Sequence, residues 1–227
     1  MSDSETHLAA LVPMRHHSER VSGKNYRDFA GRPLYERILG TLQSCSEIDS
    51  IVVDTDSPPI KDGLENDFPD VQVIDRPEEL RADTTPMNDV LLHDVDVVEA
   101  DFYLQTHSTN PLLQPSTVAK AIETFLNCYP EYDSLFSVTK VQTRLWDELA
   151  RAVNHNPNIL LRTQDLPPLY EENSCLYLFT KEILEERHNR IGRRPYLFEI
   201  DRREAIDIDE EIDFRIAELM HQELYAE

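Results

Sequence analysis

The chain has 227 residues and a formal net charge of −22, from 44 Asp and Glu against 22 Lys and Arg. This length suffices for one hydrophobic core, and 40% hydrophobic residues with 5 Gly exclude a collagenous, repetitive or disordered chain. A surface this acidic repels phosphate groups, so we expect neither a nucleic-acid partner nor an anionic membrane partner.

The start of the chain and its cysteines predict a cytoplasmic protein. Residues 1–7 lack the basic and apolar stretches of a signal peptide, and no apolar run approaches the roughly 18 residues that span a bilayer. Cys45, Cys128 and Cys175 are widely spaced and odd in number, as expected in a reducing compartment.

Short apolar runs alternate with segments of helical periodicity along the first part of the chain. Residues 8–14 predict a buried strand, and Pro33 opens a helix with Leu34, Ile38 and Leu42 on one face. Strands are then expected at 50–54 and 71–75, a helix at 87–98, a strand at 101–106, a helix at 115–125 and a strand at 134–139.

Residues 142–168 break this pattern with turn signals and predict an excursion from the sheet, which we interpret as a dimerisation arm. The pattern returns with a strand at 174–179, a helix at 181–187, strands at 196–200 and 205–209, and a closing helix at 210–224. This alternation predicts an α/β fold with a doubly wound, mostly parallel sheet, in a single domain over residues 1–227. Ligands of such sheets bind beyond the carboxyl ends of the strands.

The loop after the first strand, residues 15–25, gathers three cations in a strongly acidic chain. Arg15, Arg20 and Lys24 are joined there by the hydroxyl of Ser18, and Gly23 allows close approach of the backbone. Such a loop can surround a triphosphate, although it lacks the GxxxxGK[ST] pattern of a Walker loop. The alternative is a solvated surface loop whose cations offset neighbouring carboxylates.

A pair of carboxylates near the C-terminus predicts a metal site. On the strand expected at 205–209, Asp207 and Asp209 point to the same face, and two adjacent carboxylates suit Mg²⁺. So acidic a chain contains such triplets by chance. The triplet at 94–96 falls in a predicted helix, where its two carboxylates diverge, so we assign it no role.

Two further positions follow strand ends. His107 lies in a polar segment after the central strand, and a lone His there is more often structural than functional. Arg76 follows the third strand and either contacts a nucleotide base or pairs with a nearby acid.

Five segments, in this order and spacing, resemble the acylneuraminate (CMP-sialic acid) cytidylyltransferases, and the resemblance covers nearly the whole chain. They are residues 15–25, 54–56, 76–84, 107–111 and 205–209. The resemblance implies a Rossmann-like (GT-A-like) nucleotidyltransferase fold. It also implies that a sugar-acid hydroxyl attacks the α-phosphorus of CTP and releases pyrophosphate.

The resemblance assigns roles to residues of this chain, and it places Arg15, Lys24, Asp207 and Asp209 in catalysis. It implies nucleotide binding by Arg15, Ser18, Arg20, Lys24, Asn25, Arg76 and Thr85, with Asn25 on the ribose and Arg76 on the cytosine. It implies Mg²⁺ binding by Asp207 and Asp209, and sugar-acid binding by His107, Thr109 and Asn173. A homodimer is expected.

Four positions depart from the family pattern. Glu19 replaces a Lys, Arg20 a Gly, Met87 a Ser, and Glu171 an Arg that helps to bind the sugar acid. The acceptor therefore stays open between sialic acid, another nonulosonic acid and a related keto-sugar acid. Two alternatives also stay open: CTP-dependent activation of Kdo or a phosphonate, and a nucleotide-binding module without activity. The transferase hypothesis requires the cationic loop to face the carboxylate pair across a single crevice.

Overall fold

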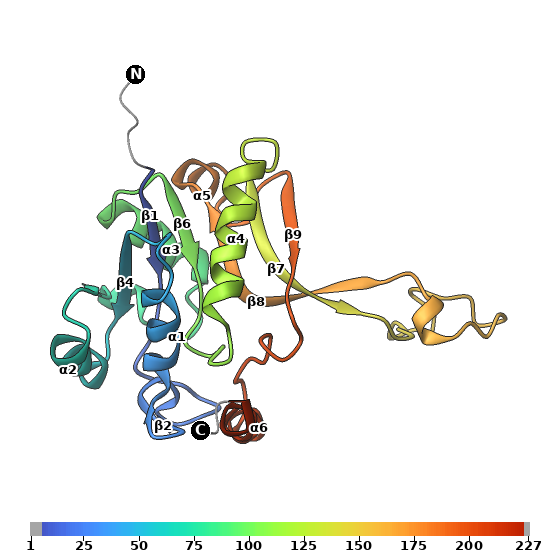
Figure 1. Cartoon of the computed structure of the whole chain (residues 1–227), viewed down its shortest axis with the longest axis horizontal. Helices are drawn as coiled ribbons and strands as arrows, with labels where there is room; N and C mark the ends of the chain where they lie inside the picture. The colour runs from blue at the N-terminus through green and yellow to red at the C-terminus, as the bar shows by residue number, and fades with distance from the viewer. Residues whose placement is uncertain (1–5, 225–227) are drawn as a thin grey trace.

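The computed structural model describes residues 6–224. Its centre is a seven-stranded sheet with the strand order β5-β4-β1-β6-β8-β7-β9 (Figure 1). The strands are β1 (Leu8–Leu11), β4 (Ser50–Thr55), β5 (Gln72–Asp75), β6 (Phe102–Gln105), β7 (Ser134–Val141), β8 (Leu169–Phe179) and β9 (Pro195–Glu199). Neighbouring strands are parallel except at β8, which runs antiparallel to β6 and β7. The mostly parallel sheet expected from the sequence is confirmed.

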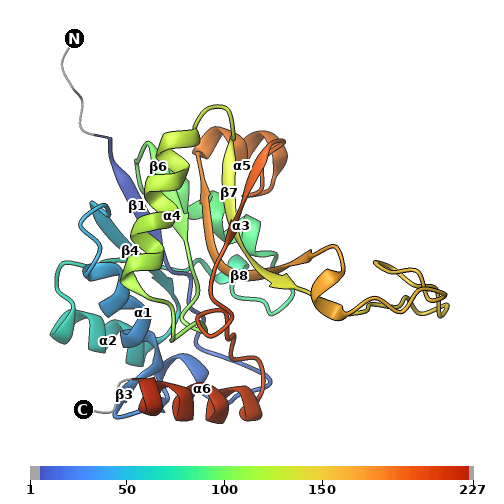
Figure 2. The ribbon, with the colours of Figure 1, turned by 45° about the vertical axis from the view of Figure 1, so that its right-hand side comes forward.

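Helices cover both faces of this sheet (Figures 1 and 2). They are α1 (Leu34–Gln43), α2 (Pro58–Asp67), α3 (Met87–Val97), α4 (Pro115–Cys128) and α5 (Lys181–Arg187), whereas α6 (Glu211–Leu224) packs in a separate core. Leu8 and Ala10 of β1 pack in a core with α1, α2 and α4, whereas Ala9 and Leu11 pack in a second core with α3 and α5. Because side chains of a strand alternate between faces, one short apolar strand serves both cores, as in a doubly wound fold.

A third, smaller core joins the N-terminal loop to the C-terminal helix. Val21 and Phe29 pack there with Ile208 and Phe214. Phe29 belongs to a short hairpin of β2 (Asp28–Phe29) and β3 (Arg32–Pro33), which lies beside α6 below the main sheet (Figures 1 and 2). This core brings two segments that are far apart in the sequence to the carboxyl edge of β1.

The strand predicted at 205–209 is wrong. This segment is the end of a turn followed by extended chain outside both sheets. Ile208 is buried in the third core, and its N–H donates to the carbonyl of Thr109 at 3.0 Å instead of to a neighbouring strand. The alternation of Ile and Asp therefore belongs to a loop here, and the loop is held in place by the buried side chain of Ile208.

Helix α2, strand β8 and the β2/β3 hairpin also differ from the prediction. Helix α2 was not predicted, because Pro58 and Pro59 resemble a break; they occupy the first turn of the helix, where proline is tolerated. Strand β8 begins at Leu169, before the predicted residue 174, because its first half pairs with the end of β7.

Residues 142–168 project from the body as an arm beyond the ends of β7 and β8 (Figures 1 and 2). The arm contains the short helix η3 (Thr163–Asp165) and an isolated bridge between Trp146 and Ala152. Most of its apolar side chains are exposed, Leu160 to 90%, whereas Leu166 at the base of the arm is buried. None of the helices within residues 6–224 combines the length and the apolar character of a membrane-spanning segment.

Candidate active site

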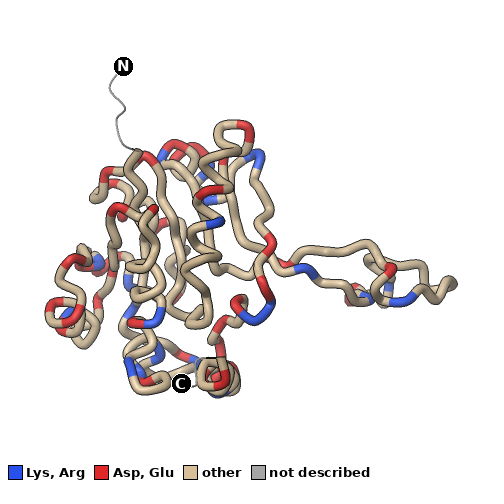
Figure 3. The backbone as a smooth tube through the Cα atoms, viewed as in Figure 1, with Lys and Arg blue, Asp and Glu red and all other residues tan. Residues whose placement is uncertain are grey.

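A cavity of about 350 Å³ opens at the carboxyl ends of β1, β5 and β6. Predicted site residues that line it are Arg15, Ser18, Arg20, Lys24, Asn25, Arg76, Thr85, His107 and Thr109. Figure 3 shows several Lys and Arg gathered at this lower end of the body, beside α6, while Asp and Glu spread over most of the chain. The structure thus brings the cations together at the edge where such sheets bind ligands.

The cationic loop, residues 15–25, is fixed by hydrogen bonds of its own. The side-chain amide of Asn25 donates to the carbonyl of Arg15 at 2.9 Å and accepts from the hydroxyl of Ser108 at 2.8 Å. Arg15 pairs with Asp83 on the cavity wall at 2.5 Å. Asn25 is therefore buried and engaged in shaping the loop, and its contact with a ribose stays a prediction.

The loop and the segment that carries the C-terminal carboxylate pair are in direct contact, and of the two groups the loop alone lines the first cavity. Nζ of Lys24 donates to the carbonyl of Ile208 at 2.6 Å, and Arg20 pairs with Asp209 at 2.6 Å. Burial lowers the pKa of Lys24 from its ordinary value of 10.5, although Asp207 and Asp209 act in the opposite direction. These contacts place a poorly solvated ammonium between the cavity and two carboxylates.

Asp207 has the environment of a ligand for a hard cation. It is half-buried and accepts a hydrogen bond from Thr109, and burial raises the pKa of its carboxyl. Its Oδ1 is buried and has no hydrogen-bond partner among the described residues. A buried carboxylate oxygen without a donor is costly unless a cation meets it. The donor set at Asp207 and Asp209 therefore fits Mg²⁺, and this assignment stays a prediction.

Arg76 is buried behind the cavity and paired with an acid, one of the two alternatives that the sequence leaves open. Its Nε donates to Oδ1 of Asp54 on β4, and its Nη2 donates to the carbonyl of the same residue at 3.3 Å. Arg76 also lines the cavity. Its ion pair with Asp54 holds the guanidinium in place from behind, so a contact with the nucleotide base stays a prediction.

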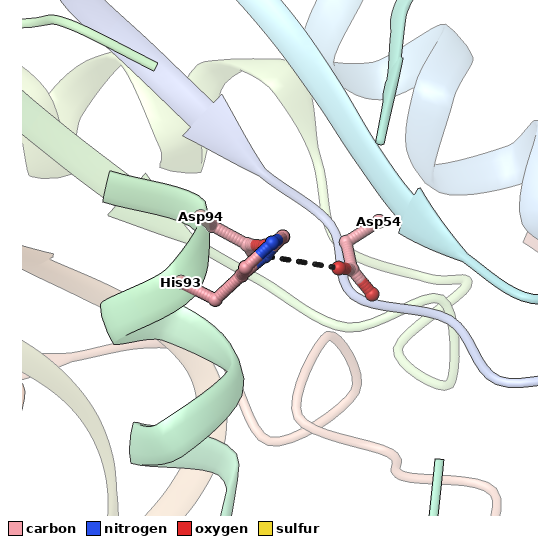
Figure 4. Close-up of side chains that lie close together, drawn as sticks. All are labelled: Asp54, His93 and Asp94. Atoms are coloured by element: carbon pink, nitrogen blue, oxygen red, sulfur yellow. Dashed lines mark hydrogen bonds and ion pairs between the residues drawn. The ribbon is translucent and has the colours of Figure 1, made fainter. Parts of the chain in front are cut away.

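Two side chains of helix α3 lie close to Asp54 (Figure 4). His93 and Asp94 of α3 point toward Asp54, and one oxygen or nitrogen from each lies within 4.8 Å of the others. Burial and the neighbouring charge of Asp54 raise the pKa of Asp94 well above its ordinary value of 3.8. Asp94 therefore holds a proton more tightly than an ordinary carboxyl does, and Oδ2 of Asp54 is a buried acceptor without a hydrogen-bond partner among the described residues.

A shared proton explains this cluster better than a metal ion does. Arg76 already supplies the positive charge that Asp54 needs, and two buried carboxylates that meet without a second cation keep one proton between them. The sequence analysis considered Asp94 only as a partner of Asp96 on the same helix and therefore assigned it no role. In the structure, Asp94 lies close to Asp54 on strand β4.

A second cavity, of about 300 Å³, lies on the far side of Asp207. Asn173 lines it, and the amide of this residue accepts from Ser137 at 2.6 Å and donates to Thr139 at 2.9 Å. Asn173 is thus not on the first cavity but beside Asp207. Glu171 and Arg202 also line this second cavity.

Comparison with known proteins identifies the family. The profile of a family described as Cytidylyltransferase matches residues 9–227. The chain belongs to this cytidylyltransferase family. A CMP-N,N′-diacetyllegionaminic acid synthase of Legionella pneumophila is 30% identical over 230 residues, which cover 93% of this chain and 94% of that protein. N-acylneuraminate cytidylyltransferase A of Danio rerio is 28% identical over 221 residues, and this chain spans about half of its length (50%).

Solved structures of cytidylyltransferases share the fold. A CMP:2-keto-3-deoxy-manno-octonic acid synthetase in complex with CTP superposes with a TM-score of 0.70 at 15% identity, covering 96% of this chain and 100% of that one. A 4-diphosphocytidyl-2C-methyl-D-erythritol synthase gives a TM-score of 0.68 at 18% identity, covering 95% and 99%. The Rossmann-like nucleotidyltransferase fold expected from the sequence is confirmed.

The sequence did not predict several residues that the structure of this cytidylyltransferase places around the cavity. Asp54 and Asp94 are one example, and another is buried Gln105, which contacts the half-buried Arg190 and His107. Asp54 and Asp94 are not close in the sequence, nor are Gln105 and Arg190. The signal available in the sequence was that Asp54 and Gln105 are polar residues at the ends of predicted apolar strands.

Proposed function

We propose that this protein transfers CMP from CTP to a sugar acid and releases pyrophosphate. The observation that carries the proposal is the contact of the cationic loop, which lines the first cavity, with Ile208 and Asp209 of the segment that carries both carboxylates. In the reaction, the acceptor's hydroxyl oxygen forms a bond to the α-phosphorus as the bond to the bridging oxygen of pyrophosphate breaks. The proton of the hydroxyl passes to solvent.

The cations of the loop stabilise the leaving group. Arg15 and Lys24 line the cavity with Ser18, and the charge that develops on pyrophosphate needs donors that are already in place. Lys24 is held by the carbonyl of Ile208, so its ammonium loses little freedom when the triphosphate binds. We assign the triphosphate to these three residues.

Asp207 and Asp209 are the residues that would hold Mg²⁺. A bound Mg²⁺ supplies Lewis acidity to the α-phosphate and orients the attacking hydroxyl. The unpartnered oxygen of Asp207 and the position of both carboxylates beside Lys24 support this assignment.

The second cavity is where we place the acceptor. It shares Asp207 with the reaction centre, and Arg202 gives it a positive charge where Glu171 replaces the arginine of the family pattern. A carboxylate of the acceptor needs such a cation, whereas Glu171 favours amino and hydroxyl donors on the sugar. Among the relatives, the Legionella protein is named for a diacetylated nonulosonic acid, so we propose that class of acceptor.

Pyrophosphate release from CTP and Mg²⁺ tests the proposal across a panel of acceptors: N-acetylneuraminate, N,N′-diacetyllegionaminate, pseudaminate, Kdo, a phosphonate and none. We expect release with at least one nonulosonic acid, none without an acceptor, and formation of the CMP-sugar in equal amount. Pyrophosphate release with Kdo alone, or with the phosphonate alone, would contradict a nonulosonic acid as the acceptor and identify that compound's class instead. CTP binding without release would favour the inactive module that Glu19 and Glu171 suggest.

We also propose that the arm, residues 142–168, joins two copies of the chain into a homodimer. Leu149 is 65% exposed, and the outward apolar side chains Trp146, Val153, Ile159 and Leu160 share the arm with it. A row of exposed apolar groups of this kind is costly in water unless another surface covers it. Because the arm continues β7 and β8 of the sheet, we include it in the same domain.

Replacing Leu149 and Leu160 together with Asp shifts the protein from a dimer to a monomer. Each new carboxylate would be buried without a cation at the interface, which disfavours association. Light scattering after size-exclusion chromatography measures the mass, and Leu126→Asp on exposed α4 serves as the matched control. An unchanged mass in the double variant would exclude the arm as the interface.

A further inference from the structure

A chain of polar contacts connects the second cavity to His107 on the first. The hydroxyl of Tyr177 donates to Glu172 at the second cavity, and the guanidinium of Arg190 stacks on the Tyr177 ring with its carbon 3.5 Å from the centroid. Arg190 in turn contacts Gln105, and Gln105 contacts His107. The predicted function uses His107 alone among these residues, so the purpose of the others needs an explanation.

Arg190 fixes which way the Gln105 amide points. Nη1 of Arg190 donates to Oε1 of Gln105 at 2.6 Å, and a guanidinium has no acceptor atom. The amide nitrogen of Gln105 must therefore face the other way. There it donates to the carbonyl of Thr106 at 2.9 Å and lies 3.1 Å from Nε2 of His107. Both amide protons are used, and Gln105 is fully buried.

The orientation of Gln105 determines the proton position on His107. Because the amide nitrogen of Gln105 is a donor, Nε2 of His107 is the acceptor and carries no proton. The proton of a neutral imidazole must then be on Nδ1. Among the described residues, Nδ1 of His107 has no hydrogen-bond partner, and His107 lines the first cavity.

We propose that Arg190, acting through Gln105, is a positioning residue that holds His107 as the neutral imidazole protonated on Nδ1. In this form His107 donates a hydrogen bond from Nδ1 to an oxygen of the acceptor. The identity of that oxygen rests on the proposed function, whereas the proton position does not.

The surrounding charges support this assignment. Burial, followed by the positive charges of Arg190 and Lys24, lowers the pKa of His107 to about 3 from its ordinary value of 6.5. His107 is therefore neutral over the pH range in which the protein is assayed. With Nε2 engaged and so low a pKa, His107 does not accept the proton of the attacking hydroxyl.

Nitrogen NMR of the ¹⁵N-labelled full chain, without ligands at pH 7, reads the tautomer directly. His107→Gln assigns the His107 signals by their loss. We expect a protonated Nδ1 and an unprotonated Nε2 in the wild type. In Gln105→Glu a carboxylate replaces the donor, so we expect the proton to move to Nε2 and the pKa of His107 to rise. A wild-type imidazole protonated on Nε2, or a tautomer unchanged in Gln105→Glu, would overturn the proposal.

Arg190→Met tests the positioning role, and Arg194→Met on the neighbouring exposed surface is the matched control. Without Arg190, the Gln105 amide turns freely and both tautomers of His107 appear. Loss of one hydrogen bond is expected to raise the acceptor KM by about three- to tenfold while the CTP KM stays within twofold. Exclusive Nδ1 protonation in Arg190→Met with an unchanged acceptor KM would exclude Arg190 from this role. If no acceptor supports turnover, the proposed function is wrong. The NMR experiment still tests the proton position on His107, because it uses the protein without ligands.

Discussion

Replacing Asp54 with Asn lowers the free energy of unfolding by about 3–5 kcal/mol at pH 7, because it leaves a buried guanidinium without its anion. Asp54 is 1% exposed and Arg76 is 4% exposed, so water cannot take over the lost charge. Urea denaturation followed by circular dichroism measures the change. Asp75→Asn is the matched control, because Asp75 is an exposed carboxylate on the adjacent strand that pairs with Lys61.

Asp94→Asn gives the opposite result although Asp94 is equally buried. Since Asp94 is protonated in the folded protein, an amide reproduces its donor, and we expect a change below about 1 kcal/mol. The folded state also holds this proton at pH values at which the unfolded chain has released it. Unfolding therefore releases a proton, and the free energy of unfolding falls as the pH rises above 3.8.

Asp94→Asn removes this contribution, so its stability depends less steeply on pH than that of the wild type. Similar losses in Asp54→Asn and Asp94→Asn would contradict the shared proton. A stabilisation of the wild type by Mg²⁺ that both variants abolish would instead favour a metal ion at this cluster.

The cationic loop and the carboxylate pair show what the sequence could predict about this site. The loop follows the first strand of an α/β pattern, and the carboxyl ends of parallel strands meet at one edge, so the position of Lys24 follows from periodicity alone. The position of Asp209 does not. It depends on the packing of Ile208 in a core with Val21 and Phe214. The sequence did not indicate this packing, because the alternation of Ile and Asp at 205–209 is also typical of a strand.

The polar groups behind the cavity show why the other contacts of the site could not be predicted from the sequence. Gln105 and Arg190 are 85 residues apart, and their contact joins the end of β6 to the loop between α5 and β9. Asp54 and Asp94 meet because α3 packs on β4. Hydrophobic periodicity predicts which face of an element is buried, but not which polar side chains share a position behind it.

Replacing either Asp207 or Asp209 with Asn lowers kcat for CMP transfer by about 100- to 1000-fold, since each removes a charge that stabilises the transition state. The amide keeps the size of the side chain, so the third core and the loop stay in place. We expect CTP affinity, measured by calorimetry, to stay within about tenfold, because the proposed triphosphate site consists of the cations of residues 15–24 and not of the two carboxylates. Mn²⁺ binding followed by electron paramagnetic resonance reports the loss of the metal ligand without relying on turnover.

Glu210→Gln is the matched control for both variants, because Glu210 is an exposed carboxylate adjacent to Asp209. We expect its kcat within about twofold of the wild type, as for a surface charge without a structural partner. Asp207→Asn should weaken metal binding more than Asp209→Asn, since Asp207 has the buried oxygen without a donor, whereas Asp209 must first release Arg20. Unchanged kcat in both variants would remove the pair from the reaction. The cationic loop would then serve nucleotide binding alone.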